Sequence, residues 1–148
     1  PPDSTPLLTR DGWLRTGDLA VRNRCGLIRL VGRSKDVIKC GGYSVCALDV
    51  EDVLASHTAV SMAVVVGVPH PRKGEAPVGV VESATSIAPT EGELIRWCLE
   101  RMAAYKAPRR IHIVPPGSLP RGTTQKVLKR LLRQQYRDDF RLADEAPQ

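Results

Sequence analysis

Two adjacent glycines, Gly41 and Gly42, lie in a stretch of the chain that also carries the cationic side chains of Arg33, Lys35 and Lys39. Glycine has no Cβ, so a glycine pair can adopt positive φ angles and lets a ligand approach the backbone closely. Lysine and arginine supply the positive charge that phosphate groups attract. The stretch therefore predicts a tight turn that could meet phosphates. Taken alone, an ordinary solvated hairpin with a glycine turn is the simpler explanation, because short glycine motifs have many false positives.

A second candidate for chemistry is Lys126, which follows Pro120, Gly122 and two threonines. These residues suit a mobile segment that folds over a ligand before a helix begins. From the residues alone, the favoured interpretation is that Lys126 is one more solvated cation beside the basic segment 129–133.

The composition describes one small basic domain of 148 residues, with a formal net charge of +6. A chain of this length buries about 70% of its unfolded surface on folding. Hydrophobic residues make up 42% of the chain but aromatic residues only 4%, so the core depends on aliphatic side chains. Few aromatic side chains also argue against a stacking platform for single-stranded nucleic acid. A basic nucleic-acid-binding module stays open as an alternative function, although no motif of that kind occurs.

The four cysteines, Cys25, Cys40, Cys46 and Cys98, form no Cys-x-x-Cys pair, and the three histidines show no spacing typical of a zinc site. Buried, reduced thiols are the favoured interpretation, and no metal site is predicted. No apolar run approaches the roughly 20 residues of a membrane span. The proline-rich opening 1–6 lacks the regions of a signal peptide. These features predict a cytoplasmic protein without a transmembrane segment.

The elements that must position these residues alternate along the chain. Helical spacing or a capping box predicts helices that begin near residue 48, after Thr90 and at residue 127, the last running to 136. Apolar runs predict strands at 27–31, 59–68, 77–81 and 110–114. The last three strands predict an α+β fold, a small three-stranded sheet packed with helices, preceded by a short β segment and a linker.

Three motifs in a fixed order carry a family resemblance. They are Gly-Trp-Leu-Arg-Thr-Gly-Asp at 12–18, Gly-Arg-Ser-Lys-Asp-Val-Ile-Lys-Cys-Gly-Gly-Tyr at 32–43 and Leu-Pro-Arg-Gly-Thr-Thr-Gln-Lys at 119–126. Together the motifs resemble the adenylate-forming superfamily, which contains acyl-CoA synthetases, peptide-synthetase adenylation domains and luciferases. The resemblance extends from about residue 11 to about residue 132. Several ordered motifs are far more specific than one.

The resemblance implies a particular domain organisation. Members carry a much larger N-terminal domain that holds the acyl pocket and a phosphate-binding loop, and nothing similar occurs in this sequence. Residues 1–33 would be the end of that domain and a linker, 34–140 a mobile C-terminal lid domain, and 141–148 a disordered tail. The missing N-terminal domain of the same polypeptide is then the main partner, the fragment alone is expected to be inactive, and nucleic acid is not expected as a partner.

The implied activity is that of an ATP-dependent acyl-CoA ligase. A carboxylic acid, by default a fatty acid, attacks the α-phosphorus of ATP and releases pyrophosphate, after which the thiol of CoA attacks the acyl-adenylate and releases AMP. ATP and CoA are expected ligands, together with Mg²⁺ that accompanies ATP, since this chain shows no metal ligands. An aryl acid and transfer to a carrier protein stay open, and so does a non-catalytic or regulatory interaction domain.

The resemblance also assigns roles to residues of the first half-reaction. Lys126 matches the catalytic lysine of adenylate formation. Asp18 matches the acid that accepts hydrogen bonds from the ribose hydroxyls of ATP, and Arg33 matches an arginine on the nucleotide side. Lys35 matches the hinge position, where a loop residue absorbs the change of φ and ψ as the domain rotates.

Rotation would bring a second set of residues to the active site for thioester formation. Lys39 is the catalytic candidate on this face. Gly41, Gly42 and Tyr43 would line the channel of the pantetheine arm of CoA, since glycines leave room for a passing ligand.

The sequence departs from the family pattern at two places. Gln125 stands immediately before Lys126, where members usually have glycine. If this position needs a positive φ, glutamine is strained by about 1 kcal/mol or more, and adenylation is weakened or the loop rearranged. Cys46 and Ala47 stand where members commonly have an aromatic residue and proline.

Overall fold

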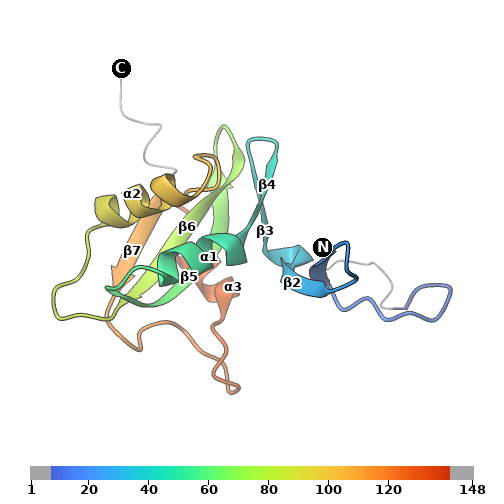
Figure 1. The fold of residues 1–148 in the computed structure, drawn as a ribbon. Coiled ribbons are helices and arrows are strands. Elements are labelled where there is room, and N and C mark those ends of the chain that lie inside the picture. Colours follow the sequence, from blue (N-terminus) through green and yellow to red (C-terminus); the bar gives the residue numbers. More distant parts are fainter. Residues whose placement is uncertain (1–7, 141–148) are drawn as a thin grey trace.

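The computed structural model describes residues 8–140, which form two β-sheets and three α-helices (Figure 1). The strands are β1 (Asp18–Arg22), β2 (Ile28–Arg33), β3 (Val37–Cys40), β4 (Tyr43–Cys46), β5 (Val60–His70), β6 (Gly74–Ser83) and β7 (Arg110–Val114). The helices are α1 (Ala47–Ala55), α2 (Glu91–Arg101) and α3 (Lys129–Gln135), with a short 3₁₀ helix η1 (Ser34–Asp36) between β2 and β3. The tail at 141–148, which the sequence predicts to be disordered, lies outside the described residues.

Strand β6 is the centre of the larger sheet. It pairs antiparallel with β5 along most of its length, parallel with β7, and antiparallel with β3 through Cys40 and Gly74. The predicted α+β class is confirmed, and the three predicted strands correspond to β5, β6 and β7. The short hairpin β3–β4 extends this sheet to five strands, because the backbone N–H of Gly41 donates to the carbonyl oxygen of Lys73 at 2.9 Å.

Strands β1 and β2 form a separate antiparallel sheet, which pairs Asp18 with Arg33. Figure 1 shows this small sheet set apart from the larger one and joined to it through η1. The sequence patterns do not predict β1, because its side chains are mostly exposed and therefore do not alternate in polarity. Strand β2 continues to Arg33, beyond the predicted end at residue 31, since the pairing with β1 includes that residue.

The larger sheet is covered on both faces, which explains the nearly continuous apolar sequence of β5. Val65 belongs to the core on the side of α1 and α2, whereas Val64 and Val66 belong to the core on the side of α3. Neighbouring residues of a strand point to opposite faces, so both faces require apolar side chains. Full burial of one such side chain contributes about 1.5–3 kcal/mol.

Helix α2 begins with the predicted capping box. The N–H of Glu93 donates to Oγ1 of Thr90 at 3.2 Å, and the Glu93 carboxylate accepts from the N–H of Thr90 at 3.5 Å. The capping box satisfies two of the free N–H groups at the helix start. Within residues 8–140, no helix has the length and apolarity needed to cross a bilayer.

Cys98, on α2, has no exposed surface, and burial raises the pKa of its thiol from 9.0 to about 11 despite the opposing charge of Arg101. In the unfolded chain the thiol ionises at its ordinary pKa, so the native state binds more protons between pH 9 and pH 11. The associated stability is complete below pH 9 and is lost as the pH rises towards 11. We expect a loss of about 2 kcal/mol across this range.

The measurement is urea unfolding at several pH values for the wild type and for Cys98→Ala. The difference in unfolding free energy between the two proteins isolates the thiol from other groups that titrate. A difference that stays constant from pH 8 to pH 11 would contradict the prediction.

Candidate active site

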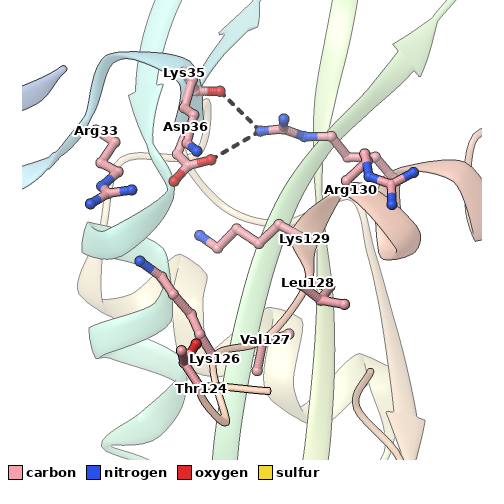
Figure 2. A pocket seen from close by; sticks show the side chains of 10 residues that line it. Arg33, Lys35, Asp36, Thr124, Lys126, Val127, Leu128, Lys129 and Arg130 are labelled. Carbon is pink, nitrogen blue, oxygen red and sulfur yellow. Dashed lines mark hydrogen bonds and ion pairs between the residues drawn. The ribbon is translucent and has the colours of Figure 1, made fainter. Parts of the chain in front are cut away.

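A cavity of about 500 Å³ lies between the end of β2 and the start of α3 (Figure 2). Its lining comes from two segments that are far apart in the sequence, residues 33–36 and residues 124–133. The structure thus brings together three of the predicted site residues, Arg33, Lys35 and Lys126.

The lining of the cavity is strongly cationic, with Asp36 as its one acidic residue. Its cations are Arg33, Lys35, Lys126, Lys129, Arg130 and Arg133. Figure 2 shows the ammonium groups of Lys126 and Lys129 pointing towards the side of the cavity where Arg33 lies, whereas Arg130 points away. An excess of one sign of charge in a concave site attracts ligands of the opposite sign, so the cavity suits an anion.

Three of these six cations already have acidic partners. Arg33 pairs with Asp18 at 3.0 Å, and Arg133 pairs with Asp36 at 3.3 Å. Lys129 pairs with the Glu51 carboxylate at 2.7 Å.

The other three have no ion pair within the described part of the chain. These are Lys35, Lys126 and Arg130. The charge of Lys126 therefore remains available to a ligand.

Lys126 sits in a small hairpin and not at the first turn of a helix. The N–H of Gly122 donates to the carbonyl oxygen of Lys126 at 2.9 Å, and Leu128 donates to the carbonyl of Pro120 at 2.8 Å. The sequence prediction that the last helix begins at residue 127 is therefore wrong, since Val127 forms a bridge with the strand-like Arg121 and the helix starts at Lys129.

Gln125 has a φ of +60° and is the one non-glycine residue with a positive φ among residues 8–140. This position therefore has the positive φ at which glutamine was predicted to be strained. A residue with a Cβ is strained by about 1–2 kcal/mol in the left-handed region. The strain lies directly beside the candidate catalytic lysine.

Replacing Gln125 with glycine should raise the free energy of unfolding by about 0.5–1 kcal/mol, because relief of the strain exceeds the extra entropy of an unfolded glycine. Gln134→Gly in the exposed part of α3 is the matched control, and there we expect a loss of about 1 kcal/mol. Chemical denaturation of both variants tests the sign. A destabilised Gln125→Gly variant would rule out strain at this position.

The predicted hinge residue Lys35 is held by helix α3. Its carbonyl oxygen accepts a hydrogen bond from Nη2 of Arg133 at 3.1 Å, and the same nitrogen contacts the Asp36 carboxylate (Figure 2). Nε of Arg133 is buried, and among residues 8–140 it has no hydrogen-bond partner. The arginine thus joins the segment before the larger sheet to the helix after Lys126.

Asp18 does not line the cavity, but its carboxylate orients the guanidinium of Arg33, which does. The N–H of Asp18 donates to Oγ1 of Thr16 at 3.2 Å, which fixes the start of β1. Asp18 and Arg33, the two predicted nucleotide residues, therefore form one ion pair at the end of the two-stranded sheet.

The other predicted site residues, Lys39, Gly41, Gly42 and Tyr43, lie at the turn of the β3–β4 hairpin and are not part of the cavity lining. The two glycines have φ angles of +57° and +84°, so the predicted tight turn is present. Nζ of Lys39 donates to Oγ of Ser44 at 2.6 Å.

The ring of Tyr43 stacks on that of Tyr105, with 4.5 Å between the ring centroids. Beside this stack, a hydrogen bond to the Asp49 carboxylate at 3.1 Å raises the pKa of Lys106. The ring stack joins the hairpin turn to the loop after α2, and the hydrogen bond of Lys106 joins the same loop to α1.

Sequence reasoning missed Lys129 and Arg133 as individual contributors to the site. A signal was present, because residues four apart lie on the same face of a helix. Their acidic partners come from distant parts of the chain, so no local pattern could assign the pairs.

Comparison with known proteins gives a consistent result. Residues 49–126 match the family model described as AMP-binding enzyme C-terminal domain. The 3-methylmercaptopropionyl-CoA ligase of Ruegeria pomeroyi is 40% identical over 133 residues, which are 90% of this chain and 24% of that protein. The long-chain-fatty-acid–CoA ligase of Salmonella typhimurium is 37% identical over 136 residues, covering 92% of this chain and 24% of the relative. The chain thus spans about a quarter of the length of these curated relatives.

Among solved structures, ATP-bound MatB from Rhodopseudomonas palustris is similar with a TM-score of 0.83 and 30% sequence identity. The match covers 90% of this chain and 26% of that structure. Apo MatB from the same organism covers the same shares, also at 30% identity, with a TM-score of 0.74.

Proposed function

This chain belongs to the AMP-binding enzyme C-terminal domain family, and we propose that it is the lid domain of an ATP-dependent, AMP-forming acyl-CoA ligase. The observation that carries the proposal is the cationic cavity, which joins Lys126 to Arg33 and Lys35 from a distant part of the chain. The names of the relatives as CoA ligases support it. Because the chain spans only a quarter of their length, the activity is proposed for the longer protein.

In the first half-reaction, the carboxylate of the acid attacks the α-phosphorus of ATP, and the bond to pyrophosphate breaks. Negative charge moves onto the phosphate oxygens, and we assign its stabilisation to the ammonium group of Lys126, which has no ion pair within residues 8–140. Asp18 accepts hydrogen bonds from the ribose hydroxyls, and Arg33 lies beside it on the nucleotide side. The greater similarity to ATP-bound MatB than to apo MatB supports assigning this arrangement to adenylate formation.

In the second half-reaction, the thiolate of CoA attacks the carbonyl carbon of the acyl-adenylate, and the bond to AMP breaks. We assign this step to the other face of the domain, the turn that contains Lys39, Gly41, Gly42 and Tyr43. The glycines leave the backbone open to the pantetheine arm, and Lys39 supplies positive charge near the leaving phosphate. Rotation about Lys35 exchanges the two faces.

The two-stranded sheet supports the presence of a larger partner domain in the same polypeptide. Its region exposes Trp13, Leu27, Ile28 and Leu30, each with at least 66% of its surface accessible. Large apolar side chains exposed in one small region of the chain are typical of an interaction surface. We assign residues 1–33 to the end of the N-terminal domain and residues 34–140 to the lid, with η1 at the boundary.

Mg²⁺ accompanies ATP in such chemistry, and we propose that it arrives bound to the nucleotide. Residues 8–140 contain no group of three or more His, Cys, Asp or Glu side chains that could hold a metal ion. We therefore assign no step to a metal held by this chain.

We propose a fatty acid as the substrate, with an aryl acid as the closest competitor. The name of the Salmonella relative supports a fatty acid, whereas the Ruegeria relative is named for a short thioether acid. CoA is the proposed acceptor. We place the reaction in the cytoplasm, and the four free cysteines are consistent with a reducing compartment.

The test is ATP–pyrophosphate exchange by the longer protein that this proposal requires, against a panel of fatty and aryl acids. Exchange that depends on one class of acid would support the proposal and identify the substrate. A folded protein that binds ATP but shows no exchange with any acid would contradict it and favour a non-catalytic or regulatory domain.

A further inference from the structure

Glu82, on the central strand β6, is a buried carboxylate that the proposed mechanism does not use. Only 6% of its side chain is exposed. Its Oε1 accepts the backbone N–H of Leu119 at 3.1 Å, at the start of the segment that leads to Lys126. Burying a carboxylate is costly unless hydrogen bonds and a cation compensate for the lost water. The buried negative charge of Glu82 therefore requires a cationic partner.

Arg121 is that partner, and its guanidinium lies between the sheet and the turn. Nη2 is 3.9 Å from Oε2 of Glu82 and 3.1 Å from Sδ of Met62 on β5. Nη1 donates to the carbonyl oxygen of Gln125 at 3.4 Å. One side chain thus connects a buried charge on β6 to the peptide group that precedes Lys126.

The hydrogen bond from Arg121 is made to the strained residue of the turn, Gln125. The carbonyl of Gln125 belongs to the peptide bond that it shares with Lys126, and Gln125 has a φ of +60°. A residue in this region keeps its conformation only where its surroundings fix it. Gly122 and Lys126 close the turn through their own hydrogen bond at 2.9 Å, but that bond does not attach the turn to the sheet.

We propose that Glu82 and Arg121 are positioning residues for Lys126: the buried carboxylate orients the guanidinium, which fixes the Gln125 peptide and so the direction of the lysine. The role rests on the proposed function, since it takes Lys126 as the cation of adenylate formation. Misplacing a catalytic group by about 1 Å can reduce the rate by about 10²-fold. The effect should fall on the adenylation step alone, because Glu82 and Arg121 are not part of the β3–β4 turn.

The test uses Glu82→Gln, Arg121→Gln and the double variant in the full-length protein. Glutamine at 82 keeps an acceptor for the N–H of Leu119 but removes the charge that orients Arg121. We expect each single variant to slow ATP–pyrophosphate exchange by about 10- to 100-fold. Thioester formation from supplied acyl-adenylate should stay within about twofold of wild type. The double variant should be no slower than the singles, because both act through one contact.

Glu91→Gln is the matched control. The Glu91 carboxylate also accepts a backbone N–H, that of Ile111 at 3.0 Å, but it lies at the start of α2. We expect both half-reactions of this variant to remain within about twofold of wild type. Equal loss of both half-reactions in Glu82→Gln would overturn the positioning role and leave only a contribution to the fold.

A second readout, amide hydrogen exchange of Gly122 and Gln125, does not depend on activity. Both amides donate within the turn that contains Lys126. Loss of the contact between Glu82 and Arg121 should therefore speed their hydrogen exchange by about tenfold or more. Unchanged hydrogen exchange of these two amides in Glu82→Gln would overturn the inference. Absence of pyrophosphate exchange in the wild type would instead contradict the proposed function, and the amide measurement would still decide whether the pair positions the turn.

Discussion

Lys126→Ala is expected to slow adenylate formation by about 10²–10³-fold, the usual effect of losing one group that stabilises developing charge. The lysine has no ion pair within residues 8–140 and lines the cavity, so its charge is available to a bound anion. Thioester formation from supplied acyl-adenylate should stay within about twofold of wild type, since we assign that step to the other face. Single-turnover measurements of the two half-reactions would separate these effects.

Arg96→Ala is the control for the loss of one positive charge. Arg96 lies on the exposed side of α2, which covers the opposite face of the sheet from α3. Both half-reactions of this variant should match wild type. If Lys126→Ala slowed both half-reactions equally, the assignment of Lys126 to adenylation alone would be wrong.

The second large effect is expected for Gly42→Leu, which should slow thioester formation by about 10- to 100-fold and leave adenylation nearly unchanged. Among the described residues other than its two chain neighbours, no heavy atom lies within 4 Å of a Cβ built at Gly42, so the added side chain would occupy open space at the hairpin turn. The pantetheine arm is proposed to pass through that space, and a displaced thiol loses the alignment on which the rate depends. The measurement is the rate of acyl-CoA formation from supplied acyl-adenylate.

The effect of backbone strain in Gly42→Leu must be separated from obstruction of the proposed channel. Gly42 has a φ of +84°, so any residue with a side chain is strained there. Gly117→Leu is the matched control for strain. Gly117 has a φ of +76° and lies in the loop after β7, and a Cβ built there also has no described atom within 4 Å apart from those of its chain neighbours. Both variants should lose about 1–2 kcal/mol of stability, but only Gly42→Leu should slow the thioester step. Equal rates of thioester formation in the two variants would show that Gly42 does not line the channel.

Much of the fold could be predicted from local patterns. The valine run of β5 requires two buried faces, and Thr90 with Glu93 marks the start of α2 through a motif that closes within four residues. The two glycines predict the turn between β3 and β4, since few other residues adopt such φ angles. The hairpin of β3 and β4 agrees with the simpler explanation for the glycine stretch, but the bounds of its strands were not predicted, because four-residue strands are too short to show a period.

The sequence by itself determined the types and order of the candidate residues, including Gln125 in place of a glycine. Only the tertiary structure decided which of them meet. Arg33 and Lys126 line one cavity because α3 packs against the sheet beside η1, and Arg133 holds the backbone of Lys35 there. Glu82 meets Arg121 because β6 is buried at the centre of the sheet. Local patterns record the conformation of neighbours in the chain, whereas contacts between distant side chains depend on how both faces of the sheet are packed.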